Sequence, residues 1–257
     1  MKVLCVGDVV GSIGRGMLRK ALPSIKQEYA VDVCIVNGEN AADGNGLTPA
    51  AANNIFESGA DVITGGNHTY KRREIYKTLN SDNRIIRPGN YPPGAPGRGY
   101  CVVNNERGAV AVINLLGVVY MEPLGCPFET LDKLLEELGR PKFCVVDFHA
   151  EATAEKKSLA FYADGRVSAV FGTHTHVQTA DEQVLPNGTG YITDVGMTGP
   201  SVSVLGIRPD RAVAKMQSKL PTRFSVADGP CQLDAVLFTL SDDTGRTVDV
   251  KRINIAD

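Results

Sequence analysis

Short apolar, β-branched runs alternate with stretches of helical periodicity in the first part of the chain. Three of these runs are typical of buried strands: Val3–Gly7, Val33–Val36 and Asp61–Thr64. Gly14–Tyr29 spaces its apolar residues as one helix face does, and Thr48 and Pro49 are typical of the cap and first turn of a second helix. With a polar helix around Arg72–Leu79, this βαβα order predicts right-handed crossovers and a mainly parallel first sheet.

The second half of the chain has a different pattern. Arg87–Gly99 is rich in Pro and Gly and predicts an extended loop. Further strands and helices are expected at Tyr100–Asn104, Ala109–Leu115, Phe128–Leu138 (helix), Phe143–Phe148, Ala152–Tyr162 (helix), Val167–Phe171, Tyr191–Ile192, Cys231–Leu240 and Thr247–Ile255. No repeat or linker interrupts this order. The pattern therefore predicts a single α/β domain over residues 1–257, with two sheets flanked by helices.

Charge and composition narrow the class of protein. The 257 residues carry a net charge of -2 and no long basic run, which argues against binding of duplex nucleic acid but permits a nucleotide-sized substrate. No apolar stretch reaches membrane-spanning length, and the early Asp8 does not fit a signal peptide. Six cysteines without a Cys-x-x-Cys pair favour a cytoplasmic protein with reduced thiols. A homo-oligomer stays open, because the Gly- and Pro-containing residues 194–209 could form a subunit contact or line a site.

Polar residues of metal-binding type follow five of the apolar runs, and all four histidines are among them. The segments are Gly7-Asp8, Asn37-Gly38-Glu39-Asn40, Gly65-Gly66-Asn67-His68, Asp147-Phe148-His149 and Gly172-Thr173-His174-Thr175-His176. Because ligands of parallel sheets bind beyond the carboxyl ends of the strands, these segments are expected to meet in one site. Asp147 is not expected to be a ligand itself: it either orients a metal-binding residue or caps the helix that follows.

Two metal ions fit the spacing of these residues. If the backbone is extended, His174 and His176 point to the same side with Cα atoms about 6.5 Å apart, and they could reach two ions about 3.5–4 Å apart. Glu39 is central enough to bridge, while Asp8 completes one ion and Asn67 with His149 the other. Imidazole, carboxylate and amide ligands without thiolate favour Mn, Fe, Zn or Co over Ca. Two carboxylates, two divalent ions and one hydroxide leave a positive centre that attracts phosphate.

The same residues carry a resemblance to a known superfamily, and it extends over essentially the whole chain. Gly65-Gly66-Asn67-His68 and Gly172-Thr173-His174-Thr175-His176 resemble the Gly-Asn-His and Gly-His-x-His motifs of calcineurin-like metallophosphoesterases. Val10 stands where the superfamily commonly has His, and Glu39 where it has Asp. Both departures match a narrower group, the YmdB-type bacterial phosphodiesterases.

This resemblance implies a fold, a site and an activity. The fold would be a four-layer α/β/β/α sandwich with two mixed central sheets. One ion would take Asp8, Glu39, Asn40 and His176, and the other Glu39, Asn67, His149 and His174. Iron or manganese is the first expectation, with zinc or cobalt as alternatives. A metal-bridging hydroxide would attack a phosphodiester, including 2′,3′-cyclic nucleotides. Strand alternation would turn His68 toward the substrate, where it would protonate the leaving oxygen or stabilise the charge of the phosphoryl group.

Other functions stay open at this stage. The same site could serve a phosphomonoesterase or nucleotidase, or a regulatory protein that binds a nucleotide and barely turns it over. A dinucleotide-binding oxidoreductase is disfavoured, because Gly11–Gly16 lacks the Gly-x-Gly-x-x-Gly spacing. This segment instead predicts a tight turn into the first helix. Arg15 and the basic residues 71–73 either contact substrate phosphate or lie on solvated helix faces.

Overall fold

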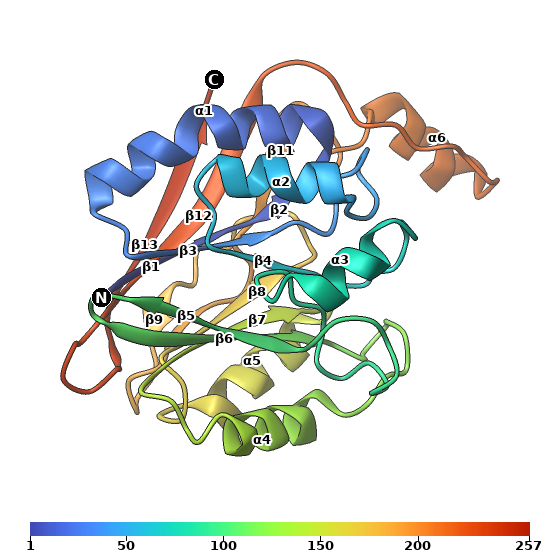
Figure 1. Cartoon of the computed structure of the whole chain (residues 1–257). Helices are drawn as coiled ribbons and strands as arrows, with labels where there is room; N and C mark the ends of the chain where they lie inside the picture. The colour runs from blue at the N-terminus through green and yellow to red at the C-terminus, as the bar shows by residue number, and fades with distance from the viewer.

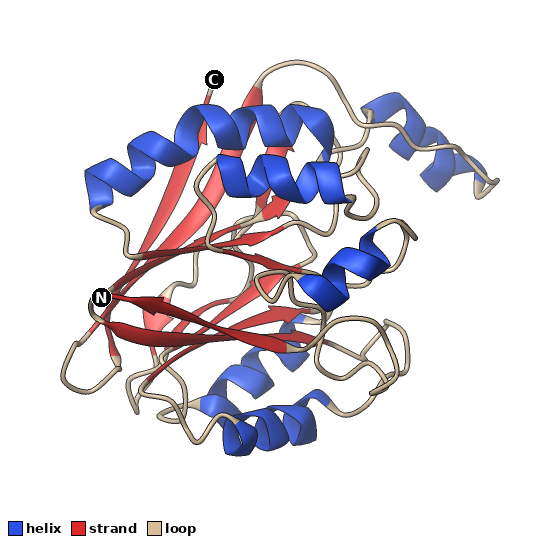
Figure 2. Cartoon of the chain, in the orientation of Figure 1, coloured by secondary structure: helices blue, strands red, loops and turns tan.

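The computed structural model describes residues 1–257, and its elements form four layers. Two mixed β-sheets pack face to face, and helices cover the outer face of each (Figures 1 and 2). The predicted α/β/β/α sandwich with two central sheets is therefore confirmed. None of the helices combines the length and the apolar composition that crossing a membrane requires.

The first sheet has the strand order β2-β11-β12-β1-β3-β4, with β13 paired to β12. Its strands are β1 (Lys2–Val6), β2 (Asp8–Val9), β3 (Val33–Asn37), β4 (Val62–Thr64), β11 (Met197–Pro200), β12 (Cys231–Leu240) and β13 (Thr247–Ala256). The strands β1, β3 and β4 run parallel, as the βαβα order predicts. The sheet is nevertheless mixed, because the C-terminal hairpin joins it antiparallel to β1. Helices α1 (Gly11–Tyr29) and α2 (Pro49–Glu57) cover it, and α3 (Ile75–Ser81) follows β4.

The second sheet has the order β5-β6-β7-β8-β10-β9. Its strands are β5 (Tyr100–Asn105), β6 (Gly108–Leu116), β7 (Phe143–His149), β8 (Ala169–Thr173), β9 (Gln183–Val184) and β10 (Gly190–Ile192). The three central pairings, from β6 to β10, are parallel, and both edge strands are antiparallel. Helices α4 (Pro127–Glu137) and α5 (Thr153–Ala163) cover its outer face (Figure 1).

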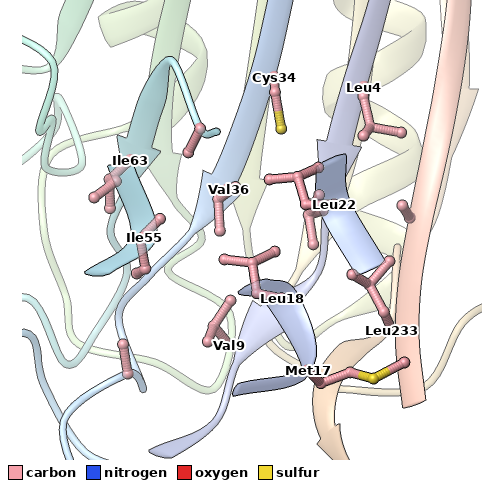
Figure 3. Close-up of a cluster of buried hydrophobic side chains, with 14 of the residues drawn as sticks. Leu4, Val9, Met17, Leu18, Leu22, Cys34, Val36, Ile55, Ile63 and Leu233 are labelled. Atoms are coloured by element: carbon pink, nitrogen blue, oxygen red, sulfur yellow. The ribbon is translucent and has the colours of Figure 1, made fainter. Parts of the chain in front are cut away.

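Three apolar clusters fill the spaces between the four layers. In β1, Leu4 and Val6 face the helices, whereas Val3 and Cys5 face the second sheet. Figure 3 shows the helix-side cluster, in which Leu18 and Leu22 of α1 lie among the side chains of β1 and β3. Burial on both faces explains why these strands read as continuous apolar runs rather than as alternating ones. Each fully buried Leu of this kind contributes about 1.5–3 kcal/mol relative to an exposed one.

Several elements differ from the sequence prediction. Helix α1 begins at Gly11 rather than Gly14, and α3 begins at Ile75, so Arg72 lies in the preceding turn. The short strands β2, β9 and β11 and helix α6 (Pro209–Ser218) have no counterpart in the prediction. Helix α6 stands away from the four layers in Figure 1, and Ala212 is its one buried residue. Its larger apolar residues, Val213 and Met216, are exposed, so the helix does not pack an apolar face against either sheet.

Candidate metal centre

The eight predicted site residues lie together at the carboxyl ends of parallel strands from both sheets. Asp8 follows β1, Glu39 and Asn40 follow β3, Asn67 and His68 follow β4, His149 ends β7, and His174 and His176 follow β8. The two sheets face each other with these ends at the same side, which brings residues 166 positions apart into contact: the His174 amide donates to Asp8 Oδ2 at 3.2 Å. All eight therefore belong to one site.

One predicted ligand set converges on His149. Its Nε2 lies 2.9 Å from Asn67 Oδ1, 3.1 Å from His174 Nδ1 and 3.4 Å from Glu39 Oε1. The ligand atoms of Glu39, His149 and His174 all lie within 4.8 Å of one another. These four side chains are thus close enough to share a single ion.

The second predicted set converges beside the first. His176 Nε2 lies 3.2 Å from Asn40 Nδ2 and 3.5 Å from Asp8 Oδ1. Asn40 Nδ2 is also 3.4 Å from Asp8 Oδ1 and 3.1 Å from Glu39 Oε1. Glu39 therefore touches both sets, which is the position that a bridging carboxylate requires. A metal ion would bind the oxygen of Asn40, so the amide, which now turns its nitrogen toward this set, would have to rotate.

Three of the imidazoles are anchored through one ring nitrogen and present the other to the site. His149 Nδ1 lies 2.9 Å from Thr173 Oγ1, which itself donates to Asp147 Oδ1, so Nδ1 of His149 donates and Nε2 is the nitrogen that faces the site. His176 Nδ1 donates to the Leu205 carbonyl at 3.0 Å, again leaving Nε2.

The third imidazole is turned the other way round. His174 Nε2 lies 3.0 Å from Glu151 Oε2, which leaves Nδ1 facing His149. Fixing one ring nitrogen by a carboxylate, carbonyl or hydroxyl is how proteins hold metal-ligating histidines. The arrangement fits the metal-ligand roles that the sequence predicts.

Asp147 orients a neighbour rather than capping a helix. It is fully buried, and its carboxylate accepts from Thr173 Oγ1 at 2.7 Å and from Asn37 Nδ2 at 3.1 Å. Helix α5 instead begins after Ala152, which makes no side-chain cap. Of the two interpretations open from the sequence, the orienting one is correct. Burial raises the pKa of Asp147 to about 6.

Charge in this site is balanced by imidazole alone. Asp8 and Glu39 are buried, and their ionic partners are histidines rather than Lys or Arg. Burial disfavours the ionised form of both carboxyl groups, but the neighbouring imidazoles outweigh it. His176 lowers the pKa of Asp8, and His149 with His68 lowers the pKa of Glu39 well below its ordinary value. Two buried carboxylates without a fixed cation suit a bound divalent ion.

The adjacent imidazoles of His149 and His174 show opposite pKa shifts. Burial disfavours the charged form of His149, but the Glu39 carboxylate outweighs this and raises its pKa to about 9. Burial and the positive charge of His149 lower the pKa of His174 to about 4. In the metal-free protein these pKa values make His149 a doubly protonated cation at neutral pH and leave His174 neutral, with a single ring proton.

The backbone around His174 and His176 contradicts the extended conformation that the sequence prediction assumes. Their φ angles are 100° and 60°, so both residues lie in the left-handed region that few residues other than glycine adopt. Thr175 between them donates its N–H and its hydroxyl to Asp194 Oδ2, at 3.0 and 2.7 Å. A turn held by Asp194, rather than strand alternation, directs both imidazoles into the site.

His68 lines the cleft, but strand alternation is not the reason for its orientation. Strand alternation does not turn it, because it lies in the turn that follows β4. Its Nδ1 lies 2.7 Å from Asn40 Oδ1 and 3.0 Å from Glu39 Oε1. With 29% of its side chain exposed, it is the most accessible of the four imidazoles. It therefore sits at the edge of the ligand cluster, next to open space.

That open space is a cleft of about 1050 Å³. Its polar wall contains Glu39, Asn40, His68, His174 and His176, and Gly11 and Ser12 at the start of α1 also line it. Arg72 borders the cleft, but its guanidinium donates to the carbonyls of Asn45 and Ala42. Arg15 does not line it and donates to the Ala41 carbonyl.

The sequence analysis missed one side of this cleft. Leu205, Ile207 and the four residues Arg223, Phe224, Ser225 and Val226 come from the segments on either side of α6. Residues 194–209 are therefore partly a lining of the site, one of the two roles that the sequence left open. Nothing in the sequence marks residues 223–226 as part of a site, because two apolar residues separated by one Ser are too short a pattern to predict an element.

Comparison with known proteins identifies the family. The family model described as YmdB-like protein matches residues 4–253. The chain is 46% identical to the 2′,3′-cyclic-nucleotide 2′-phosphodiesterase of Bacillus subtilis (strain 168) over 258 residues, which covers 100% of this chain and 98% of that protein. A crystal structure of a hypothetical protein from Thermus thermophilus superposes with a TM-score of 0.94 at 39% identity, with 100% of both chains covered.

A second solved structure resembles this chain to a similar degree. The crystal structure described as a novel phosphatase from Mycoplasma pneumoniae matches with a TM-score of 0.93 at 34% identity, covering 100% of this chain and 93% of that one. The four layers are thus those of the metallophosphoesterase type, and the chain belongs to the YmdB-like protein family.

Proposed function

We propose that this protein is a phosphodiesterase that hydrolyses 2′,3′-cyclic nucleotides with two divalent transition-metal ions. One ion would be held by Asp8, Glu39, Asn40 and His176, and the other by Glu39, Asn67, His149 and His174. The observation that carries this proposal is the set of three imidazoles, each anchored through one nitrogen and turning the other toward a cluster that contains the buried carboxylates of Asp8 and Glu39. Bound ions supply a nucleophile from water at neutral pH and neutralise charge on the phosphoryl oxygens.

The chemistry of the ligands supports transition metals. Imidazole, carboxylate and amide donors without thiolate suit Fe, Mn, Zn or Co, and we propose iron or manganese as the native metals. Glu39 would hold the two sites together, because its carboxylate contacts residues of both sets. The substrate class rests on the relative that is 46% identical over the whole chain and is named a 2′,3′-cyclic-nucleotide 2′-phosphodiesterase.

His68 is the proposed proton donor to the leaving oxygen. Its imidazole lines the cleft, and its Nδ1 faces the Asn40 amide and the Glu39 carboxylate; after the Asn40 amide rotates, its nitrogen would take the place of its oxygen beside Nδ1. This leaves Nε2 without a partner in the protein, so that it can face a substrate. A positioned imidazole that transfers a proton in the transition state contributes roughly 10²–10⁴-fold to the rate of such reactions.

The test combines metal analysis with product analysis. The metal-free protein is reconstituted with Fe, Mn, Zn or Co, and 2′,3′-cyclic AMP is supplied. We expect two ions per chain and 3′-AMP as the product, since hydrolysis of the 2′ ester bond leaves the phosphate on the 3′ oxygen. Faster release of phosphate from 3′-AMP would identify a phosphomonoesterase instead. Failure to bind any of the four metals, together with no hydrolysis, refutes the proposal.

Two matched variants separate ligation from proton transfer. His68→Ala should keep two ions per chain and lower kcat roughly 10²-fold or more. His149→Ala should lose metal as well as activity, because Nε2 of this residue is the point on which one set converges. Wild-type turnover by the His68 variant would refute the proton-donor assignment alone.

A further inference from the structure

The segment between β11 and β12 forms an apolar side of the cleft. Leu205 and Ile207 precede α6, and Phe224 and Val226 follow it, and all four line the cleft. The two arms are paired to each other: Ile207 forms an antiparallel bridge with Val226, and the Arg208 amide donates to the Ser225 carbonyl at 3.1 Å. The Ala227 amide donates to the Gly206 carbonyl at 2.9 Å. These bonds fix the position of the backbone that carries Phe224.

Two of these side chains are about half exposed where they line the cleft. Phe224 is 49% exposed and Leu205 is 46% exposed, although both lie at a site whose other residues are mostly polar. Exposed apolar surface beside convergent polar groups is typical of a ligand-binding cleft, in which the polar groups orient one part of the ligand and the apolar surface binds another. Phe224 therefore offers an aromatic face to whatever the polar side of the cleft binds.

The apolar side directly borders the ligand cluster. The Leu205 carbonyl accepts the Nδ1 proton of His176 at 3.0 Å, so this backbone segment contacts a residue of the site. In a 2′,3′-cyclic nucleotide, the cyclic phosphate and the base are attached to one ribose ring. A group that binds the base must consequently lie in the same cleft as the groups that bind the phosphate. Leu205 contacts one of those groups, and Phe224 lines the same cleft.

We infer that Phe224 stacks on the base of the nucleotide, with Leu205 beside it, and thereby makes the enzyme prefer nucleotides over cyclic phosphates that lack a base. This inference rests on the proposed function. Every base has an aromatic face, so stacking on Phe224 provides binding without selecting strongly among bases. Stacking of this kind changes affinity by roughly 10-fold or more when the aromatic side chain is removed.

Two substrates test the inference. One is 2′,3′-cyclic AMP, and the other is glycerol 1,2-cyclic phosphate, which has the same five-membered phosphodiester without ribose or base. Phe224→Ala should raise KM for 2′,3′-cyclic AMP roughly 10-fold or more, while kcat/KM for glycerol 1,2-cyclic phosphate and the metal content stay unchanged. Phe224→Tyr should restore the wild-type KM. Phe161→Ala is the matched control, because Phe161 is 59% exposed on α5 and does not line the cleft.

The outcomes distinguish this inference from the proposed function. An unchanged KM for 2′,3′-cyclic AMP in Phe224→Ala overturns the inference, whether or not the wild type accepts the base-free substrate. An equal decrease in kcat/KM for both substrates also overturns the inference, since the substitution would then affect the site as a whole. If the metal-loaded wild type hydrolyses neither substrate, the proposed function fails first.

Discussion

A buried ion pair next to the candidate metal centre allows a direct test of the structure. Lys156 of α5 is 1% exposed, and its Nζ lies 2.7 Å from Oδ2 of Asp194, which is fully buried. The same Oδ2 accepts both hydrogen bonds from Thr175, the residue between His174 and His176. The pair therefore connects helix α5 to the strained turn that carries two predicted ligands.

Lys156→Met keeps most of the side-chain volume and removes the charge. Breaking a buried pair by deleting one partner leaves the other charge without compensation, which costs about 3–5 kcal/mol. For a chain of this size, each kcal/mol corresponds to a shift of about 2–4 °C in Tm, so the expected decrease is roughly 6–20 °C. We also expect the variant to retain less metal after dialysis, because Asp194 orders the turn between the two histidines.

The assay is thermal and chemical unfolding of the metal-free protein, with metal content measured separately. Arg19→Met is the control: Arg19 and Glu57 form a pair at 3.2 Å, but the two side chains are 61% and 65% exposed. Such an exposed pair contributes about 0–1 kcal/mol. The free energy of unfolding of the double variant Lys156→Met/Asp194→Asn should decrease by less than the sum of the two single decreases, and the difference should be about 0.5–3 kcal/mol. A loss in Lys156→Met no larger than in Arg19→Met would refute the reasoning.

Three further predictions concern the metal centre. Gly66→Ala should abolish metal retention, because an added Cβ would lie 2.3 Å from Glu39 Oε2 and 2.5 Å from His149 Nε2. Gly16→Ala is the control: a Cβ at this position of α1 would have nothing within 4 Å, so this substitution should stabilise the helix by about 0.5–1 kcal/mol. Thr173→Val should weaken metal binding about 10- to 100-fold with little change in shape, since it removes the hydroxyl that holds His149 Nδ1; equal affinity measured by competition with a chelator would contradict this. Metal binding at neutral pH should release a proton, because the pKa of His149 in the metal-free protein is about 9 and an ion must displace the proton on Nε2. The number of protons released should fall as the pH rises through 9. Calorimetry in buffers of different ionisation enthalpy measures this number.

The sequence predicts the layers well because they depend on apolar pattern. Buried runs such as Val33–Val36 and Phe143–Phe148 lie within the strands observed, and Thr48 accepts the capping bond from the Ala51 amide as predicted. The site residues follow from the same pattern, because the carboxyl ends of parallel strands must meet at one side of a sheet. Helix α6 could not be predicted in this way, because it packs one residue, Ala212, into the core.

The local conformation of the site depends on contacts that no local pattern reveals. His174 and His176 adopt left-handed φ angles because Asp194 binds the residue between them, and Asp194 is held by Lys156 from a helix. A lysine on a helix is ordinarily solvated, so the sequence offers no reason to bury this one. The error in the extended-strand assumption thus comes from a tertiary contact overriding local preference.

The site lies across the interface between the two sheets, and this has an energetic consequence. Asp8, Glu39, Asn40 and Asn67 follow strands of the first sheet, whereas His149, His174 and His176 belong to the second. Each proposed ion would therefore take ligands from both sheets, and its binding free energy would add to the apolar packing between them. A ligand at about 1,000 times its Kd stabilises the folded state by about 4.1 kcal/mol. Unfolding separates the sheets and the ligands, so metal affinity and folding stability would be coupled in this chain. The backbone strain at His174 and His176 positions their imidazoles to bind the ions, and ion binding would in turn offset the free-energy cost of that strain.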